Sequence, residues 1–223
     1  GTGVCNGTVA IHLALVALGL GKGDEVIVPT FTYIASANPI LQVGATPVFA
    51  DSRADTWQLD AEDVKAKITP KTKAIMVVHL YGHPCDIGSE YKGKKVGSFG
   101  DVACFSFFGN KTITCGEGGM VLTNSDYLYG RLVHFKGQGL AKYREYWHDT
   151  MGYNYRMTNI EAAIGLAQFE QVEDFISRKQ NVARWYKEKL KNLPVKFHDA
   201  VGKVRHTWWM CSILVGSESE RED

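Results

Sequence analysis

Lys111 is the residue of this sequence whose neighbours most favour covalent chemistry. The run Ser106-Phe107-Phe108-Gly109-Asn110-Lys111 leaves an apolar strand, and Gly116-Glu117-Gly118-Gly119 follows it. A lysine at the mouth of a sheet, among small and aromatic residues, loses solvation, which lowers the pKa of the amine and frees it to form a Schiff base. Most lysines are solvated surface charges, so this motif alone leaves that simpler interpretation open.

A second motif, Asn6-Gly7-Thr8, stands where an opening strand turns into an apolar helix. Backbone N–H groups at a helix start, together with the positive end of the helix dipole and a threonine hydroxyl, form an anion site. Phosphate is the ligand that this chemistry favours. The simpler alternative is that Asn6 caps the helix and Gly7 makes a tight turn.

Two aromatic segments complete the candidates. Tyr33 follows Pro29-Thr30-Phe31-Thr32 at the carboxyl end of a predicted strand, where open α/β sheets bind ligands, and its ring suits stacking on a planar cofactor. Ordinary packing at a helix start explains Tyr33 equally well. The polar and aromatic loop 152–158, which contains Asn154, is a candidate surface for a partner subunit.

Histidines and cysteines point away from metal and disulfide chemistry. His79 and His83 are four residues apart, but the following Pro84 argues against a helix that would turn both rings towards one metal ion. His12 lies in an apolar helix and is interpreted as a hydrogen-bonded core histidine. The odd number of scattered cysteines, without a C-x-x-C pair, favours a reducing cytoplasm. These cysteines are Cys5, Cys85, Cys104, Cys115 and Cys211.

The charge balance excludes nucleic acid and membrane surfaces as expected partners. The 223 residues carry a net charge of +1, with 25 basic and 24 acidic side chains, so no field attracts a polyanion. No apolar stretch is long enough for a membrane span, and no signal peptide is recognised. Small molecules and a second subunit remain as expected partners.

The pattern of apolar residues alternates between helix and strand, which predicts an α/β fold with a central sheet covered on both faces. The run 74–79 is continuously apolar, as in a buried parallel strand. Helices are predicted over residues 8–18, 33–43, 61–68, 158–172 and 182–190, and strands over 25–28, 46–49, 74–79, 102–107, 120–123 and 207–215.

One connection in this pattern is too short. Residues 81–100 show no helical period, although they join two strands that should be parallel. A parallel crossover needs a dozen or more residues, usually including a helix. A crossover helix is therefore expected to be missing here.

The motifs NGT, PTFTY, SFFGNK with GEGG, and GYNYRMTNIEAA, in this order, resemble the DegT/DnrJ/EryC1/StrS family of aminotransferases that use pyridoxal 5'-phosphate (PLP). The resemblance covers nearly the whole chain. It implies the PLP-dependent transferase fold type I, similar to aspartate aminotransferase, with a mostly parallel central sheet covered by helices. Residues 1–194 would form the large PLP-binding domain, and residues 195–223 the start of an incomplete C-terminal small domain.

The same resemblance implies a role for each candidate. Lys111 matches the lysine that carries PLP. Gly7, Thr8 and Ser106 match phosphate contacts, and Tyr33 matches the ring that stacks on the cofactor. Asn154 matches an asparagine that reaches the phosphate from the neighbouring subunit, which implies a homodimer with a shared site. The implied reaction passes an amino group from L-glutamate to a nucleotide-linked 4-keto-6-deoxy sugar, with a GDP-sugar favoured. No metal is implied.

The sequence departs from the family after Ile87. A helix and a strand are expected there, and the strand ends in an aspartate that pairs with the pyridine nitrogen of PLP; here Gly88-Ser89-Glu90 follows directly. Asp86 and Glu90 are the nearest carboxylates. Two explanations remain: the sequence gives only the ordered part of a longer enzyme, or the chain is a non-catalytic, dimer-forming remnant. A nucleotide-binding module is disfavoured because no G-x-G-x-x-G spacing is present.

Overall fold

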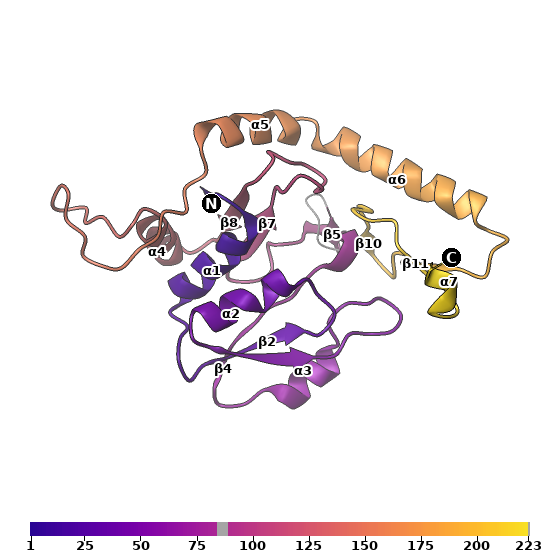
Figure 1. Cartoon of the computed structure of the whole chain (residues 1–223), viewed down its shortest axis with the longest axis horizontal. Helices are drawn as coiled ribbons and strands as arrows, with labels where there is room; N and C mark the ends of the chain where they lie inside the picture. Colours follow the sequence, from indigo (N-terminus) through magenta and orange to yellow (C-terminus); the bar gives the residue numbers. More distant parts are fainter. Residues whose placement is uncertain (84–88, 223) are drawn as a thin grey trace.

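The computed structural model of the chain describes residues 1–83 and 89–222 as a mixture of short sheets and helices (Figure 1). The expected gap between residues 87 and 88 lies outside the described residues. The strands are β1 (Thr2–Val4), β2 (Glu25–Pro29), β3 (Thr46–Ala50), β4 (Thr72–Ile75), β5 (Glu90–Tyr91), β6 (Lys94–Lys95), β7 (Ala103–Ser106), β8 (Gly119–Leu122), β9 (Lys196–Phe197), β10 (Val204–Arg205) and β11 (Ile213–Leu214). The α-helices are α1 (Gly7–Leu18), α2 (Asn38–Gln42), α3 (Ala61–Lys67), α4 (Asp126–Lys136), α5 (Asn159–Phe169), α6 (Val172–Lys189) and α7 (Ser219–Glu222).

Helix α1 is the buried helix that the sequence predicts. The Asn6 side chain caps it by accepting a hydrogen bond from the Val9 N–H at 3.0 Å, and Gly19 ends it in the left-handed conformation. His12 is 6% exposed, and its Nδ1 lies 3.2 Å from the Tyr155 hydroxyl. Burial lowers the pKa of His12, which favours the neutral ring. The interpretation of His12 as a hydrogen-bonded core residue is confirmed.

A parallel sheet forms one unit of the molecule, with strand order β3-β2-β4. Its central strand β2 is apolar and almost entirely buried. Side chains of α2 and α3 belong to the two buried clusters that contain the residues of β2. The predicted helix 33–43 is instead a 3₁₀ turn, η1 (Ile34–Ser36), followed by α2. Pro39 explains the break, since a proline is tolerated only in the first turn of a helix.

An antiparallel sheet forms a second unit, with strand order β1-β8-β7. Helix α1 packs on β7 and β8 and also on α4. The buried side chains of this unit form one core cluster around Leu13, Val121 and Leu132, each fully buried. The sheet therefore fixes the start of α1 against the end of β7.

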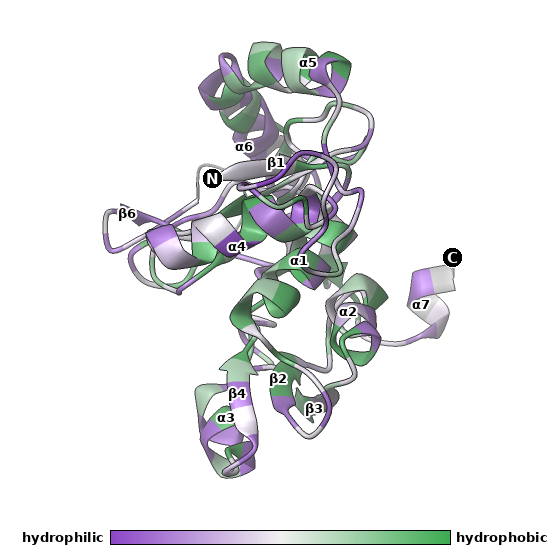
Figure 2. Ribbon diagram, turned by 90° about the vertical axis from the view of Figure 1, so that its left-hand side faces the viewer, coloured by the Kyte–Doolittle hydropathy of each residue, from purple (hydrophilic) through white to green (hydrophobic). Residues whose placement is uncertain are grey.

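The expectation of one mostly parallel central sheet is wrong for the described residues. Their three-stranded sheets are separate, and β4 and β7 are edge strands of different sheets. Figure 2 shows the parallel unit below and the antiparallel unit above. Ile75 and Val77 of the apolar run 74–79 are 46% and 53% exposed, because β4 has a strand partner on one side only. This run was expected to be buried.

Helices α5 and α6 extend across the top of Figure 1, beyond the two sheets. Helix α5 starts close to residue 158, as predicted, with a capping box in which Thr158 and Glu161 exchange hydrogen bonds. Helix α6 begins at Val172, ten residues before the predicted start, so that boundary was wrong. The predicted strand 207–215 is short, since only β11 forms within it. No described helix is long and apolar enough to cross a membrane.

Candidate functional site

The loop between β7 and β8 carries Lys111 and is tied together by its own backbone. The Phe107 N–H donates to the Gly118 carbonyl at 2.9 Å, and the Lys111 N–H donates to the Phe108 carbonyl at 2.9 Å. The Thr114 hydroxyl also donates to the Phe107 carbonyl at 2.9 Å. These bonds place the half-buried Lys111 on a closed turn just beyond the end of β7.

The start of α1 lies directly against this loop. Asn6 forms a bridge with Gly118, and a Cβ added to Gly7 would lie 2.5 Å from Cβ and 2.9 Å from Oγ of Ser106. The Ser106 hydroxyl and the exposed Thr8 therefore flank a helix start, whose first N–H groups have no partner within a helix. These residues fit a phosphate group, because hydroxyls and backbone N–H groups are its usual donors.

Gly7→Ala tests how close this approach is. The new methyl group would overlap Ser106, so we expect the free energy of unfolding to fall by about 1–3 kcal/mol, measured by urea denaturation. Gly130→Ala in α4 is the matched control, because a Cβ there meets no atom within 4 Å. In a helix interior that change should be neutral or stabilise by up to about 1 kcal/mol. Equal effects of the two substitutions would contradict the predicted overlap.

Tyr33 and Asn154 belong to elements other than α1 and the loop between β7 and β8. Tyr33 precedes η1 on the parallel unit and is 78% exposed, so its ring is available for stacking. Asn154 is exposed and forms a backbone bridge with Gly137 at the end of α4. The structure thus brings together Gly7, Ser106 and the Lys111 loop, whereas Tyr33 and Asn154 project from other elements.

Trp209 is a site residue that the sequence reasoning missed. Nζ of Lys111 lies 3.4 Å from the centre of its indole ring, and the indole N–H donates to the Asn110 carbonyl at 2.9 Å. Residues 207–215 were expected to form a strand of a second domain, and nothing in that pattern places a side chain on Lys111. The adjacent pair Trp208-Trp209 was the available signal, since two large aromatic residues in sequence normally face different neighbours.

Three buried histidines join the C-terminal segment to the body beside this contact. The ring centroids of His83 and His198 are 5.0 Å apart, and His206 lies 5.4 Å from each. Burial lowers the pKa of all three, that of His206 to about 3, so the rings pack as neutral groups. In the described part of the chain, no three His, Cys, Asp or Glu side chains are arranged to hold a metal ion.

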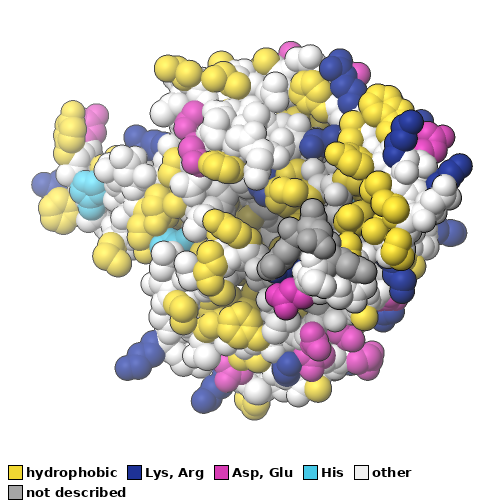
Figure 3. Space-filling view, turned by 45° about the vertical axis from the view of Figure 1, so that its right-hand side comes forward, with side chains coloured by type: hydrophobic (Ala, Val, Ile, Leu, Met, Phe, Trp, Pro, Cys, Tyr) yellow, Lys and Arg dark blue, Asp and Glu magenta, His cyan; other side chains and the backbone are white. Residues whose placement is uncertain are grey.

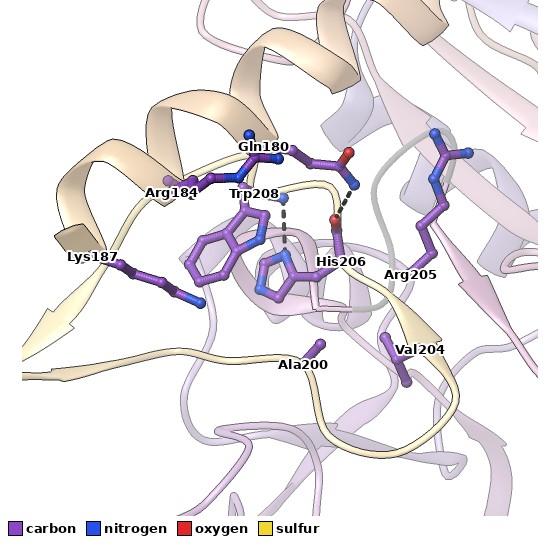
Figure 4. A pocket seen from close by; sticks show the side chains of 9 residues that line it. Gln180, Arg184, Lys187, Ala200, Val204, Arg205, His206 and Trp208 are labelled. Carbon is purple, nitrogen blue, oxygen red and sulfur yellow. Dashed lines mark hydrogen bonds between the residues drawn. The ribbon is translucent and has the colours of Figure 1, made fainter.

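Trp208 faces a different surface from Trp209, a pocket of about 510 Å³ against α6 (Figure 4). Its ring stacks on His206 at 4.3 Å, and Nζ of Lys187 lies 4.5 Å from the ring centre. The Trp208 N–H donates to Nδ1 of His206, and the Gln180 amide donates to the His206 carbonyl. Trp208 therefore contacts His206 and Lys187, whereas Trp209 contacts Lys111. Trp208 is thus a suitable comparison for Trp209.

Asp86 and Glu90 are the carboxylates nearest to the expected gap. Glu90 is paired with Lys95, whose hydrogen bond at 2.8 Å lowers the pKa of Glu90 and fixes its side chain within the β10-β5-β6 sheet. Asp86 lies outside the described residues. Glu90 is thus engaged in a surface ion pair.

Comparisons with known proteins agree along the whole chain. The model of the DegT/DnrJ/EryC1/StrS aminotransferase family matches residues 1–89 and 87–223. GDP-perosamine synthase of Escherichia coli O157:H7 is 59% identical over 244 residues, covering 100% of this chain and 67% of the relative. The GDP-perosamine synthase of Vibrio cholerae is 49% identical, covering 98% of this chain and 66% of the relative. The chain spans about two thirds of the length of these curated relatives.

Solved structures resemble this fold closely. DesV from S. venezuelae, in complex with a ketimine intermediate, has a TM-score of 0.91 and 33% identity over 98% of this chain and 65% of its own. Spr1654 from Streptococcus pneumoniae, in its PLP form, has a TM-score of 0.91 and 29% identity over 99% of this chain and 68% of its own. The α/β fold is therefore that of these proteins, in truncated form.

The comparisons also bear on the interior of the chain. The family match is split into two segments that meet at residues 87–89. The alignment with the Escherichia coli relative spans 244 positions, whereas this chain has 223 residues, so about 20 positions of the relative have no counterpart.

Proposed function

Because the chain belongs to the DegT/DnrJ/EryC1/StrS aminotransferase family, we propose that it is the cofactor-binding part of a PLP-dependent sugar aminotransferase. Its proposed reaction passes an amino group from L-glutamate to a GDP-linked 4-keto-6-deoxy sugar, as a perosamine synthase would for O-antigen and lipopolysaccharide sugars. The observation that carries this proposal is the 59% identity with a GDP-perosamine synthase across the entire chain.

Each candidate residue has a proposed part in this function. When bound, PLP supplies the electron sink for amino transfer. Lys111 holds the cofactor covalently and, as a free amine, moves a proton at the substrate carbon. Gly7, Thr8 and Ser106 bind the phosphate, which is supported by their meeting at the start of α1. Tyr33 stacks on the cofactor ring.

A lysine at position 111 also bears on whether the reaction is a transamination or a dehydration. A related dehydratase branch of the family has histidine at this position. An ε-amine can form a carbon–nitrogen double bond with an aldehyde, whereas an imidazole cannot. We therefore favour transamination over dehydration.

We also propose that the working unit is a homodimer in which Asn154 serves the site of the neighbouring subunit. Support comes from α5, which has no buried residue and carries exposed apolar side chains. Figure 3 shows hydrophobic side chains gathered over the region where α5 and α6 lie. The α5 side chains include Ile160, Ile164, Leu166 and Phe169, with 48–74% of their surface exposed. Such a surface suits burial against a second copy.

The second candidate function is a non-catalytic, dimer-forming remnant. It is favoured by the split of the family match at residues 87–89, where the family places the aspartate that pairs with the pyridine nitrogen. Without that carboxylate the ring nitrogen is less readily protonated, and the electron sink is weaker. We infer that the missing positions fall at this split.

The test uses the purified chain, whose mass must first be measured against 24.7 kDa to establish whether the internal gap exists in the protein. The chain is then incubated with PLP, L-glutamate and a GDP-linked 4-keto-6-deoxy sugar. Covalent PLP with formation of 2-oxoglutarate and an amino sugar supports the aminotransferase. Absence of any PLP bond supports the remnant, which keeps the scaffold and has lost the cofactor, and it rejects both the cofactor and the reaction. Covalent PLP without product rejects the reaction alone.

A further inference from the structure

The contact between Trp209 and Lys111 joins two segments that are far apart in sequence. Nζ of Lys111 lies 3.4 Å from the centre of the Trp209 indole, well within the range of a cation–π interaction. Both side chains are half-buried. One face of the amine is therefore covered by an aromatic ring rather than by water.

The ring is also fixed relative to the loop that carries the amine. The Trp209 indole N–H donates to the carbonyl of Asn110, the residue immediately before Lys111, at 2.9 Å. A ring held at its edge by Asn110 and touched on its face by Lys111 has little freedom to rotate. The indole and the lysine chain thus form one small assembly.

The backbone of Trp209 is held by two other elements. Nζ of Lys179 in α6 donates to the Trp209 carbonyl at 3.2 Å. Gly82, which has a φ of +93°, passes so close that an added Cβ would lie 2.7 Å from the Trp209 nitrogen. The Met210 N–H donates to the Tyr81 carbonyl at 3.3 Å. Contacts on both sides therefore set the depth at which the indole sits.

We propose that Trp209 is a positioning residue for Lys111, whose indole face holds the side chain in one place beside the start of α1. This inference rests on the proposed function, in which Lys111 is the nucleophile. The π face stabilises an ammonium and gives a neutral amine no comparable attraction. A charged amine cannot attack a carbonyl, so Lys111 must lose a proton to solvent before it reacts, and the neutral amine is then no longer held by the ring.

Other titratable groups touch this assembly and bear on its charge. Lys179 approaches the Trp209 backbone from α6, and Tyr81 packs against the indole at 6.4 Å from the turn before His83. The measurement must therefore change the indole alone and leave both groups in place.

The experiment measures the reactivity of Lys111 itself, without PLP. The purified chain is labelled with trace acetic anhydride at a series of pH values, and acetylation of Lys111 is quantified by peptide mass spectrometry. Trp209→Leu should lower the pH midpoint of labelling by up to about one unit and raise labelling at neutral pH by severalfold to about tenfold. Trp209→Phe, which keeps an aromatic face, should shift the midpoint by less than half as much.

Trp208→Phe is the matched control, because Trp208 contacts His206 and Lys187. It should leave the Lys111 midpoint unchanged. An unchanged or raised midpoint in Trp209→Leu, or equal shifts in the Leu and Phe variants, would overturn the proposal. If Trp209→Leu does not fold, by circular dichroism, the Phe variant decides: a small downward shift supports the proposal, and none rejects it.

A separate reaction keeps this inference distinct from the proposed function. Borohydride treatment after incubation with PLP fixes any covalently bound cofactor to the chain. A labelling shift without PLP fixation leaves the Trp209 contact standing and rejects the cofactor. PLP fixation without a labelling shift supports the cofactor and rejects the proposed role of Trp209.

Discussion

Restoring the missing segment is expected to raise amino transfer by more than about a hundredfold. The change inserts, between Ile87 and Gly88, the segment of about 20 residues of the Escherichia coli O157:H7 relative that has no counterpart here within the 244 aligned positions. Its aspartate would pair with the pyridine nitrogen of PLP. Loss of one partner of a buried ion pair costs about 3–5 kcal/mol, which is more than about a hundredfold in rate. Turnover is measured as 2-oxoglutarate release with the GDP-linked sugar.

The same insertion should also stabilise the fold. A strand placed between β4 and β7 would cover Ile75 and Val77, which are half exposed in this chain. Burying the exposed parts of two such side chains contributes about 1–3 kcal/mol. Urea denaturation should therefore give a higher midpoint and a steeper transition, since more surface is buried in one cooperative unit.

The control for this prediction is the same insertion with its aspartate replaced by asparagine. It should keep the gain in stability and lose most of the gain in turnover. If the asparagine form is as active as the aspartate form, the carboxylate is not what the chain lacks. If neither insertion changes stability, the segment does not complete a sheet between β4 and β7.

Lys111→Ala is expected to abolish covalent attachment of PLP. Lys111 lies on the closed turn beside Gly7 and Ser106, and no methyl group can form the carbon–nitrogen bond. After borohydride treatment, intact mass spectrometry should show the cofactor on the parent chain and none on the variant. In the chain with the restored segment, turnover should fall by at least about a thousandfold, because the lysine serves both as anchor and as proton carrier.

Lys71→Ala supplies the comparison, since Lys71 is an exposed lysine on the turn before β4. That variant should bind PLP as the parent does. Attachment of the cofactor to Lys111→Ala at the parent level would show that another lysine reacts, and it would remove the basis of the proposed site.

Local signals explain which parts of the fold the sequence predicts. Helix α1 was predicted because its apolar residues surround the helix and its end is marked by Gly19. Strand β2 is short, apolar and bounded by a proline, and it was predicted nearly to the residue. The start of α5 was likewise predicted to within one residue, at Thr158, which caps the helix. In each case the determinant lies within a few residues of the element.

Parts that depend on distant partners were not predictable in this way. The early start of α6 is an exception, because Val172, Phe175 and Ile176 stand at helical spacing and gave a local signal that was missed. The exposure of Ile75 follows from the position of β4 at the edge of its sheet among the described strands, not from its own neighbours. Lys111 was identified as a candidate from its neighbours and an ordered set of motifs, whereas Trp209 reaches it from almost a hundred residues away.

The pairing of β1 with β8 sets an order on synthesis at the ribosome. Thr2 pairs with Val121, so β1 has no partner in its sheet until more than a hundred further residues have been made. The parallel unit needs only residues 25–75 and can form much earlier. Long-range pairing of this kind is slow and leaves apolar surface exposed while the chain waits. Helix α1 can pack on α2 as soon as the parallel unit forms, but its face towards β7, β8 and α4 stays exposed until those elements are made.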